Sequence, residues 1–94
     1  MRDYELTVLL RPDISEKELD KEIKGLSDIF EKQGAKVKSK KDPVKKSLAY
    51  EIKKVREAFY SFFVLEMAPD KVAELDKKLH LAENVIRYLL VYVG

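Results

Sequence analysis

The chain has 94 residues, of which 46% are hydrophobic and 38% are charged, and its formal net charge is +2. This length predicts a single domain, residues 1–94, and the composition excludes a disordered chain. The absence of Cys and the presence of only one His, His80, exclude disulfides, a thiol nucleophile and a multi-histidine metal site. No apolar run reaches the roughly 20 residues that cross a bilayer, and the acidic start is unlike a signal peptide, so we expect a cytoplasmic protein that does not enter membranes.

The positive charge is concentrated in residues 36–56, a segment that we call the basic strip. It contains nine Lys or Arg residues against Asp42 and Glu51, a local charge of +7, while the two flanking segments together carry −5. Such a concentration is typical of a surface that binds a polyanion. A solvated hairpin is an equally open interpretation, because lysines on an exposed strand also prevent edge-to-edge pairing.

The first elements in chain order are a strand and a helix. Residues 4–10 alternate as in a half-buried strand, with one buried face expected from Tyr4, Leu6, Val8 and Leu10. After the break at residues 11–13, Ser15 is expected to cap a helix and Glu18 to complete a capping box. The apolar stripe of this helix consists of Leu19, Ile23, Leu26 and Phe30, and Gly34 is placed to end it.

The second half of the chain repeats the pattern with more strand. Residues 35–52 predict one long, irregular strand with a bulge or loop around Pro43. A turn at residues 54–57 leads to residues 58–67, an aromatic, β-branched strand expected at the centre of the sheet. A helix is expected to start at Pro69 or Asp70 and to bury Val72, Leu75 and Leu79. A turn at residues 82–84 precedes a last strand, 85–93, which is apolar enough to predict cover on much of both faces.

The order βαββαβ predicts an α+β, ferredoxin-like sandwich in which a four-stranded antiparallel sheet has two helices on one face. The other face of the sheet is then left open. Alternation assigns nine residues to this open face: Glu5, Thr7, Leu9, Tyr60, Phe62, Val64, Arg87, Leu89 and Val91. A face this apolar should not stand in water without a partner.

Aromatic residues stand next to the basic strip, as in surfaces on which RNA bases stack: Tyr50, Phe59, Tyr60 and Phe62. We favour sheet core or a protein-protein patch for these rings. Residues 56–63 lack the glycine and the spacing of an RNA-recognition motif. His80 is interpreted first as a helix-terminal residue and second as a phosphate contact.

Enzymatic function is not supported by any pattern in the chain. The three glycines stand inside a helix, after a helix and at the last position, so no phosphate-cradling loop of the acylphosphatase kind follows the first strand. No nucleophile stands beside a base. We therefore expect no catalytic residues, no metal, no cofactor and no small-molecule substrate.

Five short pieces, in order and over nearly the whole chain, resemble bacterial small-subunit ribosomal protein six. They are the opening Met1–Leu6 with Pro12, then Gly34–Val37, Leu48–Lys54, Phe59–Pro69 and Leu75–Arg87. The chain departs from the family where Pro43–Ser47 replaces a Trp-Gly and basic segment, where Glu51 replaces a Pro, and where His80 replaces a common Arg.

The resemblance implies a structural component of the small ribosomal subunit. It would bind the central domain of small-subunit (16S-type) rRNA together with small-subunit ribosomal protein eighteen and support assembly. By the same resemblance, the RNA contacts are Arg2, Tyr4, Lys45, Lys46, His80 and Arg87. The partner interface is expected at Leu48, Tyr50, Tyr60 and Phe62. A free-standing ferredoxin-like module that pairs its sheet with a second copy remains the alternative.

Overall fold

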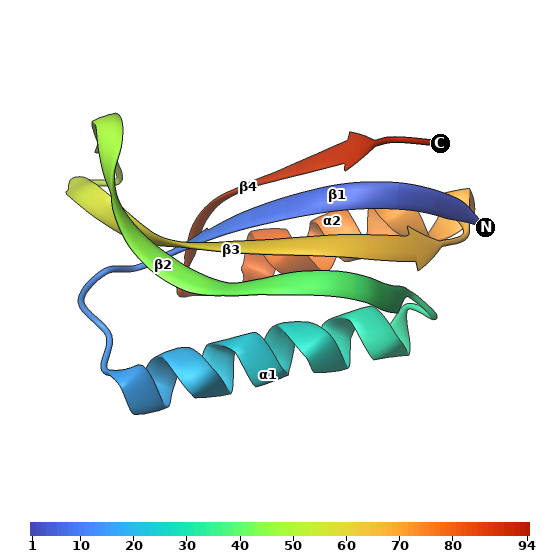
Figure 1. Cartoon of the computed structure of the whole chain (residues 1–94), viewed down its shortest axis with the longest axis horizontal. Helices are drawn as coiled ribbons and strands as arrows, with labels where there is room; N and C mark the ends of the chain where they lie inside the picture. Colours follow the sequence, from blue (N-terminus) through green and yellow to red (C-terminus); the bar gives the residue numbers. More distant parts are fainter.

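The computed structural model describes residues 1–94 and has the predicted order of elements (Figure 1). The elements are strand β1 (Arg2–Leu10), helix α1 (Glu16–Lys32), strands β2 (Lys36–Ile52) and β3 (Val55–Met67), the 3-10 turn η1 (Pro69–Lys71), helix α2 (Val72–Leu81) and strand β4 (Val85–Tyr92). The strands form one antiparallel sheet in the order β2-β3-β1-β4. Both helices lie on one side of this sheet, which confirms the ferredoxin-like fold and the central position of β3.

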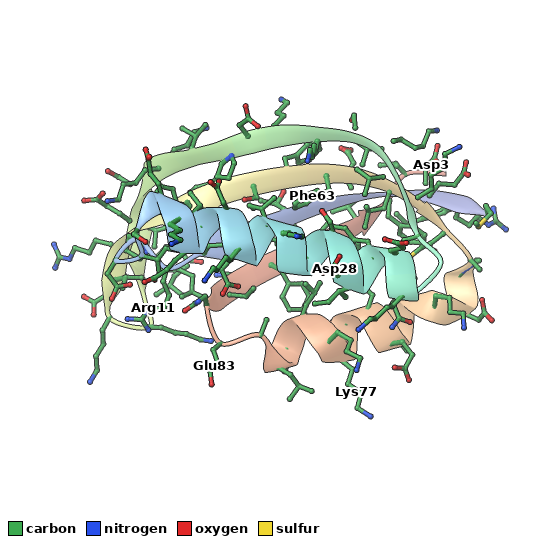
Figure 2. All side chains as sticks on the ribbon, turned by 90° about the horizontal axis from the view of Figure 1, so that it is seen from below. Asp3, Arg11, Asp28, Phe63, Lys77 and Glu83 are labelled. Atoms are coloured by element: carbon green, nitrogen blue, oxygen red, sulfur yellow. The ribbon has the colours of Figure 1, made fainter.

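The core lies between the sheet and the two helices. The face of β1 predicted to be buried is buried, because successive strand residues point to opposite faces. From the helix side, Phe30 of α1 meets Phe63 of β3 edge to face, with ring centroids 5.0 Å apart. Figure 2 views this side, on which Asp28 of α1 and Lys77 of α2 lie at the outer surface. The helices contribute five buried residues of the predicted stripes in all: Leu19, Leu26, Phe30, Leu75 and Leu79.

Both ends of α1 form as the sequence predicts. The backbone N–H of Glu18 donates to Ser15 Oγ at 3.2 Å, which satisfies one of the free donors of the first turn. At the other end, Gly34 has φ +70°, a left-handed conformation that favours glycine, and its N–H donates to the Glu31 carbonyl at 3.0 Å. These two caps mark the start and the end of α1.

Strand β2 is continuous but irregular, and its pairing with β3 shifts register at three places. One shift lies between Lys41 and Val44, which confirms the predicted irregularity around Pro43. The predicted turn at residues 54–57 is wrong: the chain turns at Lys53 and Lys54, and β3 starts at Val55. Both turn residues have positive φ, a conformation that lysine rarely adopts and that the sequence therefore does not predict.

The expected cover on both faces of the last strand is also wrong. Only Val85 and Ile86 of β4 are buried, whereas Leu89 is 62% exposed and Val91 is 42% exposed. The physical reason is topological, because β4 is an edge strand and no second layer lies on the side opposite the helices (Figure 1). An apolar run identifies a strand but does not show which neighbour covers it.

Replacement of Ser61 by Ala is expected to stabilise the fold. Ser61 is fully buried, and its hydroxyl makes no hydrogen bond with another residue. A buried hydroxyl without a partner costs free energy, so Ser61→Ala should raise the free energy of unfolding by about 1 kcal/mol. Urea unfolding measures this change, and the exposed Ser47→Ala is the control, with little expected effect. A loss of stability in Ser61→Ala would contradict the assignment.

Candidate nucleic-acid interface

The open face of the sheet is built from three cross-strand rows that alternate as predicted. β1 pairs with β3 and β4 so that Thr7 lies between Phe62 and Leu89. The neighbouring rows are Val64, Glu5 and Val91 on one side and Tyr60, Leu9 and Arg87 on the other. The register therefore places all nine predicted residues on one face, opposite the helices (Figure 1).

The lysines of the basic strip lie over aromatic rings of β3. The Lys41 ammonium is 5.5 Å from the centroid of the Phe62 ring, and that of Lys46 is 5.7 Å from Tyr60. Lys45 lies 5.4 Å from Phe59, a ring packed against the core on the helix side. Lys45 and Lys46 therefore face opposite sides of the sheet, so one flat RNA surface cannot contact both.

Residues 48–51 form an arch in β2. Ser47 pairs with Glu57 and Ile52 pairs with Val55, so four residues of β2 stand opposite the single residue Arg56 of β3. The surplus length bends the hairpin away from the helices, as Figure 1 shows at the left end of the sheet. An exposed ion pair spans the arch, with Arg56 Nε 3.8 Å from Glu51 Oε2.

The arch closes one side of an apolar groove. Tyr50 extends from the arch to β4, where its hydroxyl accepts a hydrogen bond of 2.7 Å from Arg87 Nη1. Beneath this contact lies a hollow of about 350 Å³ whose lining includes Leu9, Leu48, Tyr60 and Leu89. Three of the four residues predicted for a protein interface, Leu48, Tyr50 and Tyr60, thus meet in one groove. Phe62 lies in the adjoining hollow with Lys41 and Lys46.

A second cluster lies at the other end of the sheet. Arg2 Nη1 donates to the Tyr92 hydroxyl at 3.0 Å, and the guanidinium lies 5.8 Å from the centre of that ring. Tyr4, predicted as an RNA contact, is only 7% exposed and supports Tyr92 from below, with ring centroids 5.7 Å apart. Arg2 lies seven residues along β1 from the partner of Arg87, about 23 Å at 3.3 Å per residue.

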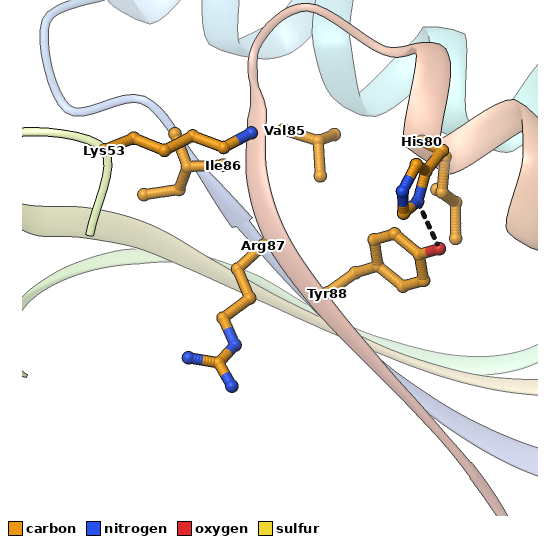
Figure 3. A pocket seen from close by; sticks show the side chains of 7 residues that line it. Lys53, His80, Val85, Ile86, Arg87 and Tyr88 are labelled. Carbon is orange, nitrogen blue, oxygen red and sulfur yellow. Dashed lines mark hydrogen bonds between the residues drawn. The ribbon is translucent and has the colours of Figure 1, made fainter.

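His80 belongs to a cluster that joins the end of α2 to β4. The Tyr88 hydroxyl donates to a carboxylate oxygen of Asp76, and His80 Nδ1 lies 3.1 Å from the same hydroxyl (Figure 3). Burial, followed by the hydrogen bond and the charge of Asp76, raises the pKa of Tyr88 to about 12. The hydroxyl therefore keeps its proton at neutral pH and acts as a donor to Asp76.

The structure thus divides the six predicted RNA contacts among four places. His80 and Arg87 line one cavity, Arg2 and Tyr4 lie at the far end, and Lys45 and Lys46 point to opposite faces. Sequence reasoning missed Tyr92 and Lys53, which complete two of these sites. The aromatic, β-branched sequence at the end of the chain could have indicated Tyr92. Nothing in the sequence indicates the positive φ that positions Lys53.

Comparison with known proteins identifies the family of this chain. The family model described as ribosomal protein S6 matches residues 3–92. The chain is similar to small ribosomal subunit protein bS6 of Symbiobacterium thermophilum, with 37% identity over 97% of this chain and 96% of that protein. It is 38% identical to the protein of the same name from Acidothermus cellulolyticus, over 97% and 95% of the two chains.

Solved structures show the same fold. The crystal structure of 30S ribosomal protein S6 from Thermotoga maritima superposes with a TM-score of 0.92 at 22% identity, covering 98% of this chain and 87% of that one. The C-terminal domain of MgtC from Mycobacterium tuberculosis gives a TM-score of 0.61 at 12% identity, over 99% and 88% of the two chains. None of the helices is long and apolar enough to span a membrane. No three His, Cys, Asp or Glu side chains are placed to hold a metal ion.

The Tyr88→Phe variant is expected to lose stability at neutral pH. The change removes the hydrogen bond that joins α2 to β4, so the free energy of unfolding should fall by about 1 kcal/mol. Because folding raises the pKa of Tyr88 from 10.0 to about 12, the stabilisation is present below pH 10 and is lost as pH rises toward 12. Absorbance at 295 nm should show a late tyrosine ionisation that Tyr88→Phe lacks and the Tyr92→Phe control keeps. Loss of that phase in the control instead would contradict the assignment.

Proposed function

The chain belongs to the ribosomal protein S6 family and is a structural, non-catalytic component of the small ribosomal subunit, and we propose that it binds rRNA there together with a protein partner. The RNA is the central domain of small-subunit (16S-type) rRNA, and the partner is small-subunit ribosomal protein eighteen. Residues 1–94 act in this role as one ribosomal-protein domain. The joint complex supports assembly of the subunit.

The observation that carries this proposal is the layering of amines on rings at the open face. Lys41 and Lys46 cover Phe62 and Tyr60, and the adjoining groove is apolar. Lysines at a surface attract phosphates, while aromatic side chains at a groove are enriched in the centres of protein interfaces. One border of the molecule therefore offers both kinds of contact side by side, which suits a protein that binds RNA jointly with another protein.

RNA contacts are proposed at two places along the β1–β4 side of the sheet. Arg2 is held by Tyr92 at one end, and Arg87 is held by Tyr50 at the other. Each guanidinium has five N–H donors, and the tyrosine contact leaves others free for phosphate or a base edge. Lys46 and His80 add to the Arg87 end, Lys45 adds charge on the helix side, and Tyr4 acts indirectly by supporting Tyr92.

The partner is proposed to fill the groove under the arch. Leu48, Tyr50 and Tyr60 would contact it directly, with Phe62 exposed to it once Lys41 and Lys46 move aside. Of these four residues Tyr50 is the most exposed, at 62%, so it has the largest surface that a partner could bury. An apolar segment from the partner would cover the surface that no second layer of this chain covers.

Binding to a central-domain rRNA fragment is expected to depend strongly on salt and on the partner. Each neutralised phosphate releases counterions, so affinity should fall steeply between 50 and 200 mM salt. Replacing Arg2 or Arg87 by Ala should each reduce the slope of log K against log salt by about one. Filter binding with and without protein eighteen measures these slopes, and the chain alone should bind poorly. Salt-insensitive affinity, or equal binding alone and with the partner, would contradict the proposal.

Two exposed tyrosines give a matched test of the partner site. Tyr50 and Tyr92 each accept a hydrogen bond from an arginine, but only Tyr50 borders the groove. Tyr50→Ala should weaken binding of protein eighteen by tenfold or more, about 1.4 kcal/mol, as expected for an interface aromatic. Tyr92→Ala should leave this affinity unchanged. Titration calorimetry without RNA measures both, and equal losses in the two variants would place the partner elsewhere.

A further inference from the structure

A cavity of about 440 Å³ lies where the end of α2, the start of β4 and the β2–β3 turn meet (Figure 3). Its charged or titratable lining residues are Lys53, His80 and Arg87, with Tyr88 beside His80, and no carboxylate lines it. The remaining wall is apolar and consists of Leu79, Val85 and Ile86. A space of this size with an apolar wall and a few polar groups is typical of a small-ligand site, and the charge selects an anion.

The turn that supplies Lys53 has a conformation that its residues do not favour. Ile52 pairs with Val55, so the loop has two residues, and both Lys53 (φ +48°) and Lys54 (φ +68°) are left-handed. Two-residue turns with this backbone favour Asn-Gly or Asp-Gly, because other side chains are strained there. Neither ammonium is paired with a carboxylate. The fold thus holds two adjacent, unpaired cations on a strained turn, as is common where a backbone is shaped for function.

The contacts of Tyr88 with Asp76 and His80 indicate which ring nitrogen of His80 acts as a donor. The only hydroxyl proton of Tyr88 goes to Asp76, so the Tyr88 oxygen must accept at its contact with His80. Nδ1 is therefore the donor at this contact, and the tautomer that fits it leaves Nε2 as an acceptor. Figure 3 shows the ring nitrogen without a hydrogen bond on the side of the ring toward Val85 and Lys53.

We propose that this cavity holds one ribonucleotide of the bound RNA and distinguishes it from a deoxyribonucleotide. The proposal rests on the RNA-binding function proposed above. Lys53 contacts the phosphate, and the ribose 2′-hydroxyl donates to Nε2 of His80. The apolar wall of Leu79, Val85 and Ile86 covers the sugar. The 2′-hydroxyl is the group by which a protein separates RNA from DNA, and an unprotonated imidazole nitrogen is a suitable acceptor for it.

The test uses the complex with protein eighteen and central-domain RNA molecules that each carry one 2′-deoxy nucleotide. At one nucleotide position, the 2′-deoxy substitution should weaken binding of the wild-type protein by about fivefold, which is the effect of losing one hydrogen bond. His80→Asn keeps a donor at the Nδ1 position but has no atom at Nε2, so it should bind the all-ribose RNA about fivefold more weakly. It should also become insensitive to the deoxy change at that position. His80→Gln, which restores a polar atom near Nε2, should recover part of the sensitivity.

Lys53 and Lys54 provide a matched pair for the phosphate contact. Lys53→Gln should reduce the salt slope by about one, whereas Lys54→Gln, whose side chain does not line the cavity, should change it less. Thermal unfolding of each variant checks that the fold is retained. If wild-type and His80→Asn complexes show the same sensitivity at every deoxy position, the ribonucleotide site is refuted while RNA binding stands. If the wild-type complex does not bind the RNA at all, the proposed function itself fails.

Discussion

The hydrogen bond between Tyr50 and Arg87 is the contact on which the functional surface depends. It joins the two edge strands of the sheet across the open face, at a donor–acceptor distance of 2.7 Å. Tyr50 lies in the segment where β2 has four residues opposite Arg56, and this surplus lifts the hairpin over the sheet. The arch turns a flat, solvated sheet into one with a groove, and it aims both Arg87 and the Lys53 turn.

The amines over the rings explain how an apolar face can stand in water without a partner. A lysine over an exposed aromatic ring contributes about 0.5–1 kcal/mol, and its stem covers part of the ring. Full burial of an aromatic side chain by a partner is worth about 1.5–3 kcal/mol. The lysines over Tyr60 and Phe62 can therefore be displaced by an interface, and they discourage pairing with the wrong strand until then. Under the proposed function, the two interpretations of the basic strip, solvated hairpin and binding surface, would describe the same lysines before and after binding.

The sequence predicts the fold well because the relevant signals are local. Ser15, Glu18 and Gly34 specify the ends of α1 through backbone hydrogen bonds within one turn, and strict alternation specifies the buried face of β1. The site is less predictable because its features depend on register. Alternation correctly places nine residues on the open face. No local sequence pattern, however, predicts that Tyr50 reaches Arg87 across two intervening strands. The position of the turn at Lys53 and Lys54 is not predicted by the sequence, because lysine rarely adopts positive φ.

In the proposed complex, Arg87 would be shared between Tyr50 and RNA, which would give a physical reason for joint binding. In the free protein, Tyr50 is 62% exposed and its hydroxyl is bonded to Arg87. A partner in the groove would bury Tyr50 and restrict Arg87, so RNA would then bind a guanidinium whose freedom has already been reduced. The side chain of Arg87 then loses its conformational entropy only once for the two binding events. This makes the two events cooperative. Coupling of this kind is reciprocal, so RNA on Arg87 must strengthen partner binding by the same factor.

Arg2 lies about 23 Å away along β1 and has no such contact with the groove, so its contribution should add to, and not depend on, partner binding.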